Sequence, residues 1–162
     1  MEQFINSHVI MGFLLIVLAV LAAWFPKKGR TPLQSAIVRL FFAALWLVGL
    51  GGLVIGVYRH PTSISVFQVV TVVALAFATI GLLADMGKLD GFRGKSGTFW
   101  YINGLGGSLI SVASASLFFL SLTYIAEFYQ ANIIWLTVVY IAVPVFVGRE
   151  FIKRSLEKEN AT

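Results

Sequence analysis

The sequence contains no cysteine, which excludes disulfide bonds, thiolate nucleophiles, cysteine-ligated zinc and iron–sulfur clusters. Charged residues are also few: they make up 12% of the 162 residues, against roughly 25% in a typical soluble domain. Hydrophobic residues, in contrast, make up 59%. A soluble domain needs polar residues on the exterior of its helices, so this composition predicts an integral membrane protein.

Five apolar segments divide the chain, and each is long enough to cross a hydrocarbon core about 30 Å thick at about 1.5 Å per residue. The segments cover about residues 8–25, 35–58, 63–84, 99–125 and 129–147. We therefore predict an all-α fold, a bundle of five transmembrane helices in one domain, residues 1–162. The last helix is expected to continue past Arg149 and to end in or near the inner headgroup layer.

Lysine and arginine fall almost entirely on one side of this topology. Of the 12 basic residues, all except Arg59 lie on the same side. They are Lys27, Lys28, Arg30, Arg39, Lys88, Arg93, Lys95, Arg149, Lys153, Arg154 and Lys158. Because cytoplasmic loops are rich in Lys and Arg, the N-terminus is predicted outside and the C-terminus in the cytoplasm. The charges follow the first apolar segment instead of preceding it, which indicates a retained span rather than a signal peptide.

Small residues form a stripe along the fourth segment. They recur at helical spacing, which puts them on one face and lets a neighbouring backbone approach closely. The predicted seam consists of Gly104, Gly107, Ser108, Ser111 and Ala115, with Gly52 and Gly56 of the second segment as the expected partner. We interpret the stripe as a helix-packing surface, and a substrate groove is the alternative hypothesis.

An ion pair is predicted between Arg39 and Asp85, where the inner ends of the second and third segments meet. Asp85 is expected at the C-terminus of a helix. Because the helix dipole disfavours negative charge there, the carboxylate needs a cation nearby. Lys88 is the competing partner. The pair would be structural. No acidic or basic residue lies in the central third of a span, which counts against a proton or ion pathway. No Ser/His/Asp set is apparent either, so the sequence predicts no catalytic residue.

His8 and His60 are the two histidines of the chain, and the topology puts both at the outer interface. Two imidazoles at one depth could hold a haem or a metal, which makes them the candidate cofactor ligands. We expect no metal or haem between them, because such ligands usually lie deeper and on facing helix surfaces.

Two later stretches resemble a family of small predicted bacterial multi-pass membrane proteins of unknown function. The first stretch is residues 101–111, Tyr-Ile-Asn-Gly-Leu-Gly-Gly-Ser-Leu-Ile-Ser, where the family reads His-Ile-x-x-Met-x-Gly-Ser-x-Ile-Ala. The second is Trp135 and Leu136, followed at the family's spacing by Pro144. His8 matches a family histidine, whereas Tyr101 and Gln34 stand where other family histidines fall. The resemblance implies the fold and a bacterial cytoplasmic membrane, and it supplies no activity.

The sequence leaves three classes of function open. We favour a non-enzymatic membrane subunit or interaction protein, in contact with lipid and with a second copy or another membrane protein, without a cofactor and without nucleic acid as a partner. An oligomeric channel or carrier for small solutes is the second class. A membrane redox protein that binds haem or quinone is the third.

Overall fold

The structure is a computed structural model that describes residues 2–25, 29–59, 66–124 and 132–160. Side chains are described between residues 10 and 157, apart from 26–28, 59–67, 118–131, 133, 134 and 137. The described residues form five α-helices, one short 3-10 helix and no strand, as the all-α prediction requires. The elements are α1 (Glu2–Trp24), α2 (Pro32–Arg59), α3 (Val66–Asp85), η1 (Phe92–Gly94), α4 (Gly97–Tyr124) and α6 (Ile133–Asn160).

The helix bounds differ from the sequence prediction mainly at polar ends. α1 begins at Glu2 instead of near residue 8, and α6 runs to Asn160 instead of ending near residue 147. The predicted starts at residues 63 and 129 lie outside the described residues. An apolar run in the sequence predicts only the part of a helix that can lie in hydrocarbon. The helix itself can be longer, because its backbone hydrogen bonds continue through polar residues. The extension of α6 past Arg149 was expected, and side-chain ion pairs between residues four apart support it.

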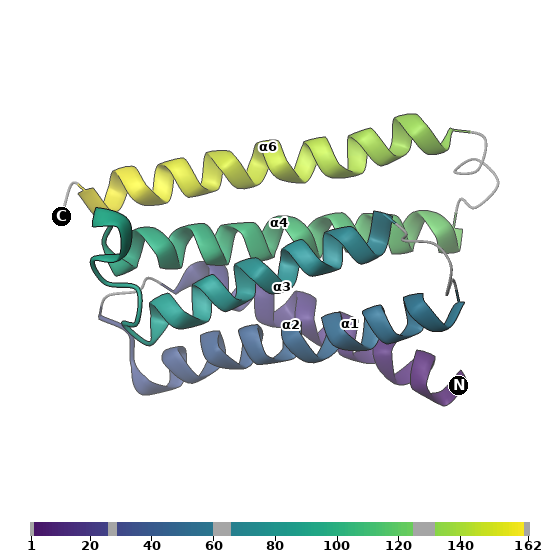
Figure 1. Cartoon of the computed structure of the whole chain (residues 1–162), viewed down its shortest axis with the longest axis horizontal. Helices are drawn as coiled ribbons and strands as arrows, with labels where there is room; N and C mark the ends of the chain where they lie inside the picture. Colours follow the sequence, from purple (N-terminus) through teal and green to yellow (C-terminus); the bar gives the residue numbers. More distant parts are fainter. Residues whose placement is uncertain (1, 26–28, 60–65, 125–131, 161–162) are drawn as a thin grey trace.

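Successive helices run in opposite directions along the long axis of the molecule (Figure 1). The chain begins at one end of the bundle and finishes at the other, beside the loop that joins α3 and α4 (Figure 1). Each of α1, α2, α3 and α4 packs against the next, and α1 also touches α4, so these four helices close a ring. α6 lies outside this ring and packs against α4.

The core of the ring combines large side chains from α2 with small residues from its neighbours. Phe41 and Phe42 are completely buried, and their ring centroids lie 5.3 Å apart. A Cβ added at Gly81 of α3 would lie 2.5 Å from Cζ of Phe42, so that glycine makes room for the ring. The tail of α6 joins the same core through Ile152 and Leu156. It packs against α4, and its predicted position in or near the headgroup layer stays a prediction.

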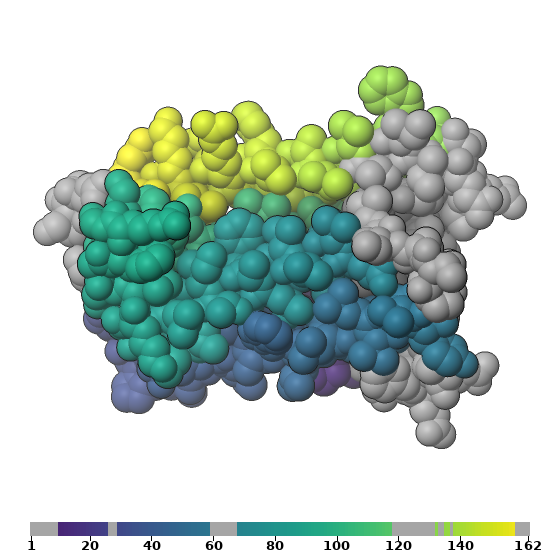
Figure 2. Space-filling model, viewed as in Figure 1, coloured from purple at the N-terminus to yellow at the C-terminus, as the bar shows by residue number. Residues whose placement is uncertain are grey.

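Two helical segments are long and apolar enough to cross a membrane, Pro32–Tyr58 in α2 and Gln68–Asp85 in α3. A shorter apolar helix covers Ile10–Trp24. Within the described residues, α4 and α6 contain no such segment. Length and composition therefore support two of the five predicted spans, and a five-span topology goes beyond this finding. The space-filling view shows how α2, α3 and α6 supply one broad face of the molecule (Figure 2).

Candidate functional site

A buried carboxylate and two arginines meet where α2, α3 and α4 reach the same end of the bundle. Asp85 is the last residue of α3, and its side chain is 1% exposed. Nε of Arg39 lies 3.0 Å from its Oδ2, which is the predicted ion pair. Arg30 contacts the other oxygen, Oδ1, with one of its terminal nitrogens. Lys88, the competing partner in the sequence analysis, is exposed.

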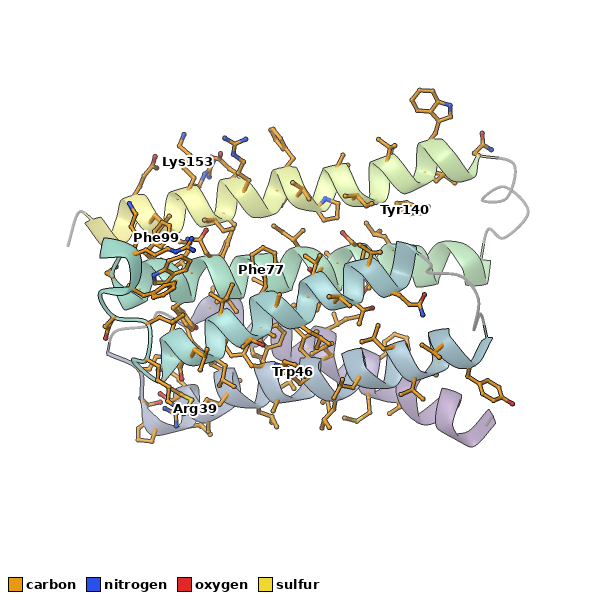
Figure 3. The ribbon with its side chains drawn as sticks, viewed as in Figure 1. Arg39, Trp46, Phe77, Phe99, Tyr140 and Lys153 are labelled. Carbon is orange, nitrogen blue, oxygen red and sulfur yellow. The ribbon has the colours of Figure 1, made fainter. Side chains whose placement is uncertain are left out.

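The two arginines differ in their surroundings. The side chain of Arg30 is 5% exposed, whereas that of Arg39 is 58% exposed. Figure 3 shows Arg39 at the end of the bundle, on its outside. Arg30 is therefore the buried partner of Asp85, and Arg39 covers the pair from the solvent or headgroup side. The sequence analysis placed Arg30 only among the general cytoplasmic charges and did not assign it to this pair.

Tyr101 of α4 completes the cluster. Its side chain is buried, its hydroxyl accepts a hydrogen bond of 3.4 Å from Arg30, and the guanidinium carbon lies 4.9 Å from the ring centroid. A guanidinium that stacks on a ring and reaches a carboxylate is held in one orientation. Arg30 thus connects the end of α3 to the first turns of α4.

Local sequence signals explain how the cluster is positioned. The hydroxyl of Thr31 accepts from the backbone N–H of Gln34, and the side chain of Gln34 accepts from the N–H of Thr31, which is a capping box with Pro32 at the first helical position. α2 consequently starts directly after Arg30. At the end of α3, Gly87 has φ +75 and Lys88 donates to the carbonyl of Leu83, which ends the helix directly after Asp85.

The electrostatics of the cluster favour a structural role. A carboxylate at a helix C-terminus opposes the helix dipole, and burial removes the water that would stabilise it. Two guanidinium groups compensate Asp85 and leave the cluster with one net positive charge. Each oxygen of the carboxylate contacts one arginine, so Asp85 connects the end of α3 to α2 and, through Arg30, to α4. This geometry agrees with the structural role predicted for the pair.

The glycine seam of α4 packs against α3, not against α2 as expected. A Cβ added at Gly104 would lie 2.3 Å from the backbone nitrogen of Gly81, and one added at Gly107 would lie 2.3 Å from the ring of Phe77. Figure 3 shows Phe77 between the two helices. Ser108 and Ser111 are buried, and Ala115 is half-buried. α3 follows α2 and precedes α4 in the chain, which explains why it fills the position between them.

The glycines of α2 also face α3. A Cβ at Gly49 would lie 2.7 Å from Cδ2 of Leu75, and one at Gly56 would lie 3.0 Å from Cγ of Gln68. Gly52, between them, is buried. Small residues therefore line the interfaces of α3 with α2 and with α4. The predicted partner of the α4 seam was wrong, whereas its predicted packing role agrees with the geometry.

Hydroxyl groups inside the bundle bond mostly to their own helix. Thr79, Ser108, Ser111 and Ser116 each donate to the carbonyl four residues earlier, at 2.8 to 2.9 Å. Such bonds satisfy a hydroxyl without requiring a ligand. Gln68, Thr71 and Ser114 are buried as well. These side chains are polar groups inside the bundle, and none of them is ionisable.

The histidines cannot be joined into a site from the described residues. The backbone of His8 belongs to α1, but its side chain lies outside the description, as does all of His60. Within the described residues, no group of three or more His, Asp or Glu could hold a metal ion. His8 and His60 therefore stay sequence-based candidates.

No protein-family model, no curated protein and no solved structure matches this chain. The resemblance of residues 101–111 and 135–144 to a family of bacterial membrane proteins stays a prediction.

Proposed function

We propose that the chain is an integral membrane protein of five transmembrane helices that acts as a non-enzymatic subunit or interaction protein. The observation that carries this proposal is the apolar exterior of the bundle. Large apolar side chains are exposed on α1, α2, α3 and α6, including Phe13, Leu47, Val72, Val143 and Phe146. Soluble monomers rarely expose contiguous apolar surface of more than a few hundred Å². Lipid would cover these side chains without cost.

The ends of the bundle support a membrane setting and an orientation. The α3–α4 loop and the C-terminal part of α6 lie at one end (Figure 1), and they hold most of the described charged residues. Trp24 is 80% exposed at this end, and Trp135 is 74% exposed near the start of α6, at the other end. Exposed aromatic rings at both ends resemble the two belts of a membrane protein. The basic end would face the cytoplasm, with the N-terminus outside.

Two features favour a role in interaction over a role in catalysis: the exposed surface of α6 and the polar groups in the interior of the bundle. Among the described helices α6 packs chiefly against α4, and much of its apolar surface is exposed, for example at Trp135, Val139 and Phe146. The buried carboxylate is occupied by two arginines, and the buried serines bond to their own helix. α6 is thus the helix to which a second copy or another membrane protein would bind.

Cysteine labelling tests the topology, because the chain has no cysteine of its own. Single variants Lys95→Cys, Thr62→Cys and Gln130→Cys would be treated in intact cells with a reagent that does not cross membranes. We expect labelling at positions 62 and 130, and labelling at 95 only after the cells are opened. Labelling at 95 in intact cells would contradict the proposed orientation. Native mass spectrometry of the purified protein would then identify a bound partner or second copy.

A further inference from the structure

The loop between α3 and α4 has a defined fold. Its backbone turns through Gly91 and Gly94, which have φ +76 and +69, and through Arg93, which has φ +51 in the region that non-glycine residues rarely adopt. The N–H of Gly91 donates to the carbonyl of Lys95 at 3.1 Å. The indole N–H of Trp100 donates to the carbonyl of Phe92, also at 3.1 Å, and fixes the loop to α4. The side chains of the loop are therefore presented in a fixed arrangement.

Three aromatic rings and two cations form one cluster on this loop, which we term the loop cluster: Phe92, Arg93, Lys95, Phe99 and Trp100. The ring of Trp100 lies 5.5 Å from that of Phe92 and 5.3 Å from that of Phe99. Arg93 stands over Phe92 at 5.6 Å, and the Lys95 ammonium stands over Phe99 at 5.4 Å. Each cation is thus held against a ring, which orients it without neutralising its charge.

The cations of α6, at the same end of the bundle, have a different setting. Arg154 is paired with Glu150 at 2.8 Å, and Lys153 with Glu157 at 3.9 Å. Figure 3 shows Lys153 on the outer side of α6. Arg93 and Lys95 make no ion pair with a carboxylate among the described residues. Within the described residues, the two cations of the loop cluster are thus not compensated by a carboxylate, in contrast to Lys153 and Arg154 of α6.

Exposed apolar side chains belong to the same loop. Phe92, which contacts the Arg93 guanidinium, is 50% exposed, and Met86, the first residue after α3, is 51% exposed. A phospholipid offers the complementary pair of groups: an anionic phosphate, and acyl chains directly beneath it. We propose that the loop cluster binds the headgroup of an anionic phospholipid, with Arg93 and Lys95 on the phosphate and Phe92 against the acyl region. This inference rests on the proposed membrane function.

The test compares two variants that remove the same charge. Arg93→Gln/Lys95→Gln changes the loop cluster, and Lys153→Gln/Arg154→Gln removes two cations from α6 as the matched control. The full chain, purified in a neutral detergent, would be titrated with phosphatidylglycerol or phosphatidylcholine, and bound lipid counted by native mass spectrometry. A basic residue near an anionic surface strengthens binding about fivefold, so the loop variant should bind phosphatidylglycerol about 30-fold more weakly. The control should bind it as the unchanged protein does.

A second measurement needs no variant. Phosphatidylglycerol binding by the unchanged protein should weaken as sodium chloride rises, because salt screens exposed charges. Equal affinity for the two lipids, or equal losses in both variants, would overturn the proposal. The outcome is independent of the topology test, because binding in detergent does not depend on orientation. Correct labelling with failed lipid binding would refute only this inference, whereas labelling at 95 from outside would refute the orientation.

Discussion

Asp85→Asn is the substitution with the largest expected effect at the end of the bundle where α2, α3 and α4 meet. It removes the charge of a carboxylate that is 1% exposed and that contacts the guanidinium of Arg30, which is 5% exposed. Removing one partner of a buried ion pair costs about 3–5 kcal/mol, because the remaining charge stays buried. Arg30→Gln should cost less, about 1.5–3 kcal/mol, since Arg39 still compensates Asp85.

Arg39→Gln should be the mildest of the three changes. Its side chain is 58% exposed, and a pair on an exposed group contributes about 0–1 kcal/mol after solvent screening. The structure thereby assigns the stronger coupling with Asp85 to Arg30, although the sequence analysis named Arg39. The two coupling energies should rank in that order in double-mutant cycles.

The assay is unfolding in mixed micelles with increasing denaturing detergent, followed by circular dichroism. Each single variant and each double variant with Asp85→Asn would be measured under the same conditions. Glu150→Gln is a suitable control, because its partner Arg154 is 77% exposed, and it should lower the free energy of unfolding far less than the changes at Asp85 and Arg30. Strict additivity of the Arg30 and Asp85 changes, or equal coupling of the two arginines to Asp85, would refute the reasoning.

Three further predictions concern packing, capping and protonation. Gly104→Ala should destabilise the protein by about 1–3 kcal/mol, because its Cβ meets a backbone that cannot rotate away; Gly12→Ala, where nothing lies within 4 Å, should be neutral or slightly stabilising in the same unfolding assay. Thr31→Ala should cost about 1 kcal/mol through loss of the capping box, measured by the same assay. The pKa of Glu150 is lowered, first by the hydrogen bond from Arg154. This pair therefore stabilises the fold above the ordinary pKa of glutamate and ceases to do so as the pH falls through the lowered pKa; Arg154→Gln should return the NMR-measured pKa towards its ordinary value.

The class of fold could be predicted from the sequence because hydrophobic runs and helical periodicity determine it locally. The contact between Arg39 and Asp85 could also be predicted, since a short connection makes α2 and α3 antiparallel neighbours. The burial of Arg30 and Tyr101 could not be predicted, because charge counting treats every basic residue near the predicted cytoplasmic face alike. A usable signal was present nevertheless. The series Thr31-Pro32-Leu33-Gln34 is a helix-start pattern, and it puts Arg30 just outside α2.

The partner of the glycine seam could not be predicted from the sequence, for a different reason. Glycines in both α2 and α4 suggested a direct contact between these helices, because small residues mark close approach. A stripe of small residues does not identify its partner, however, and α3 contributes a single glycine, Gly81, at the crossing point. Order along the chain was the better guide, because consecutive antiparallel helices usually pack together.

The contacts of α3 explain why the cluster and the seam belong to one structural unit. Gly81 lies one helical turn before Asp85, and Gly104 lies one turn after Tyr101, so the close approach of the two helices and the contact of Arg30 with Tyr101 occur at adjacent levels. Close approach brings the ring of Tyr101 to the end of α3, where Arg30 can contact both the ring and Asp85. The glycine contact thus holds Tyr101 near the buried carboxylate, and Arg30, by contacting both residues, in turn holds the helix ends together.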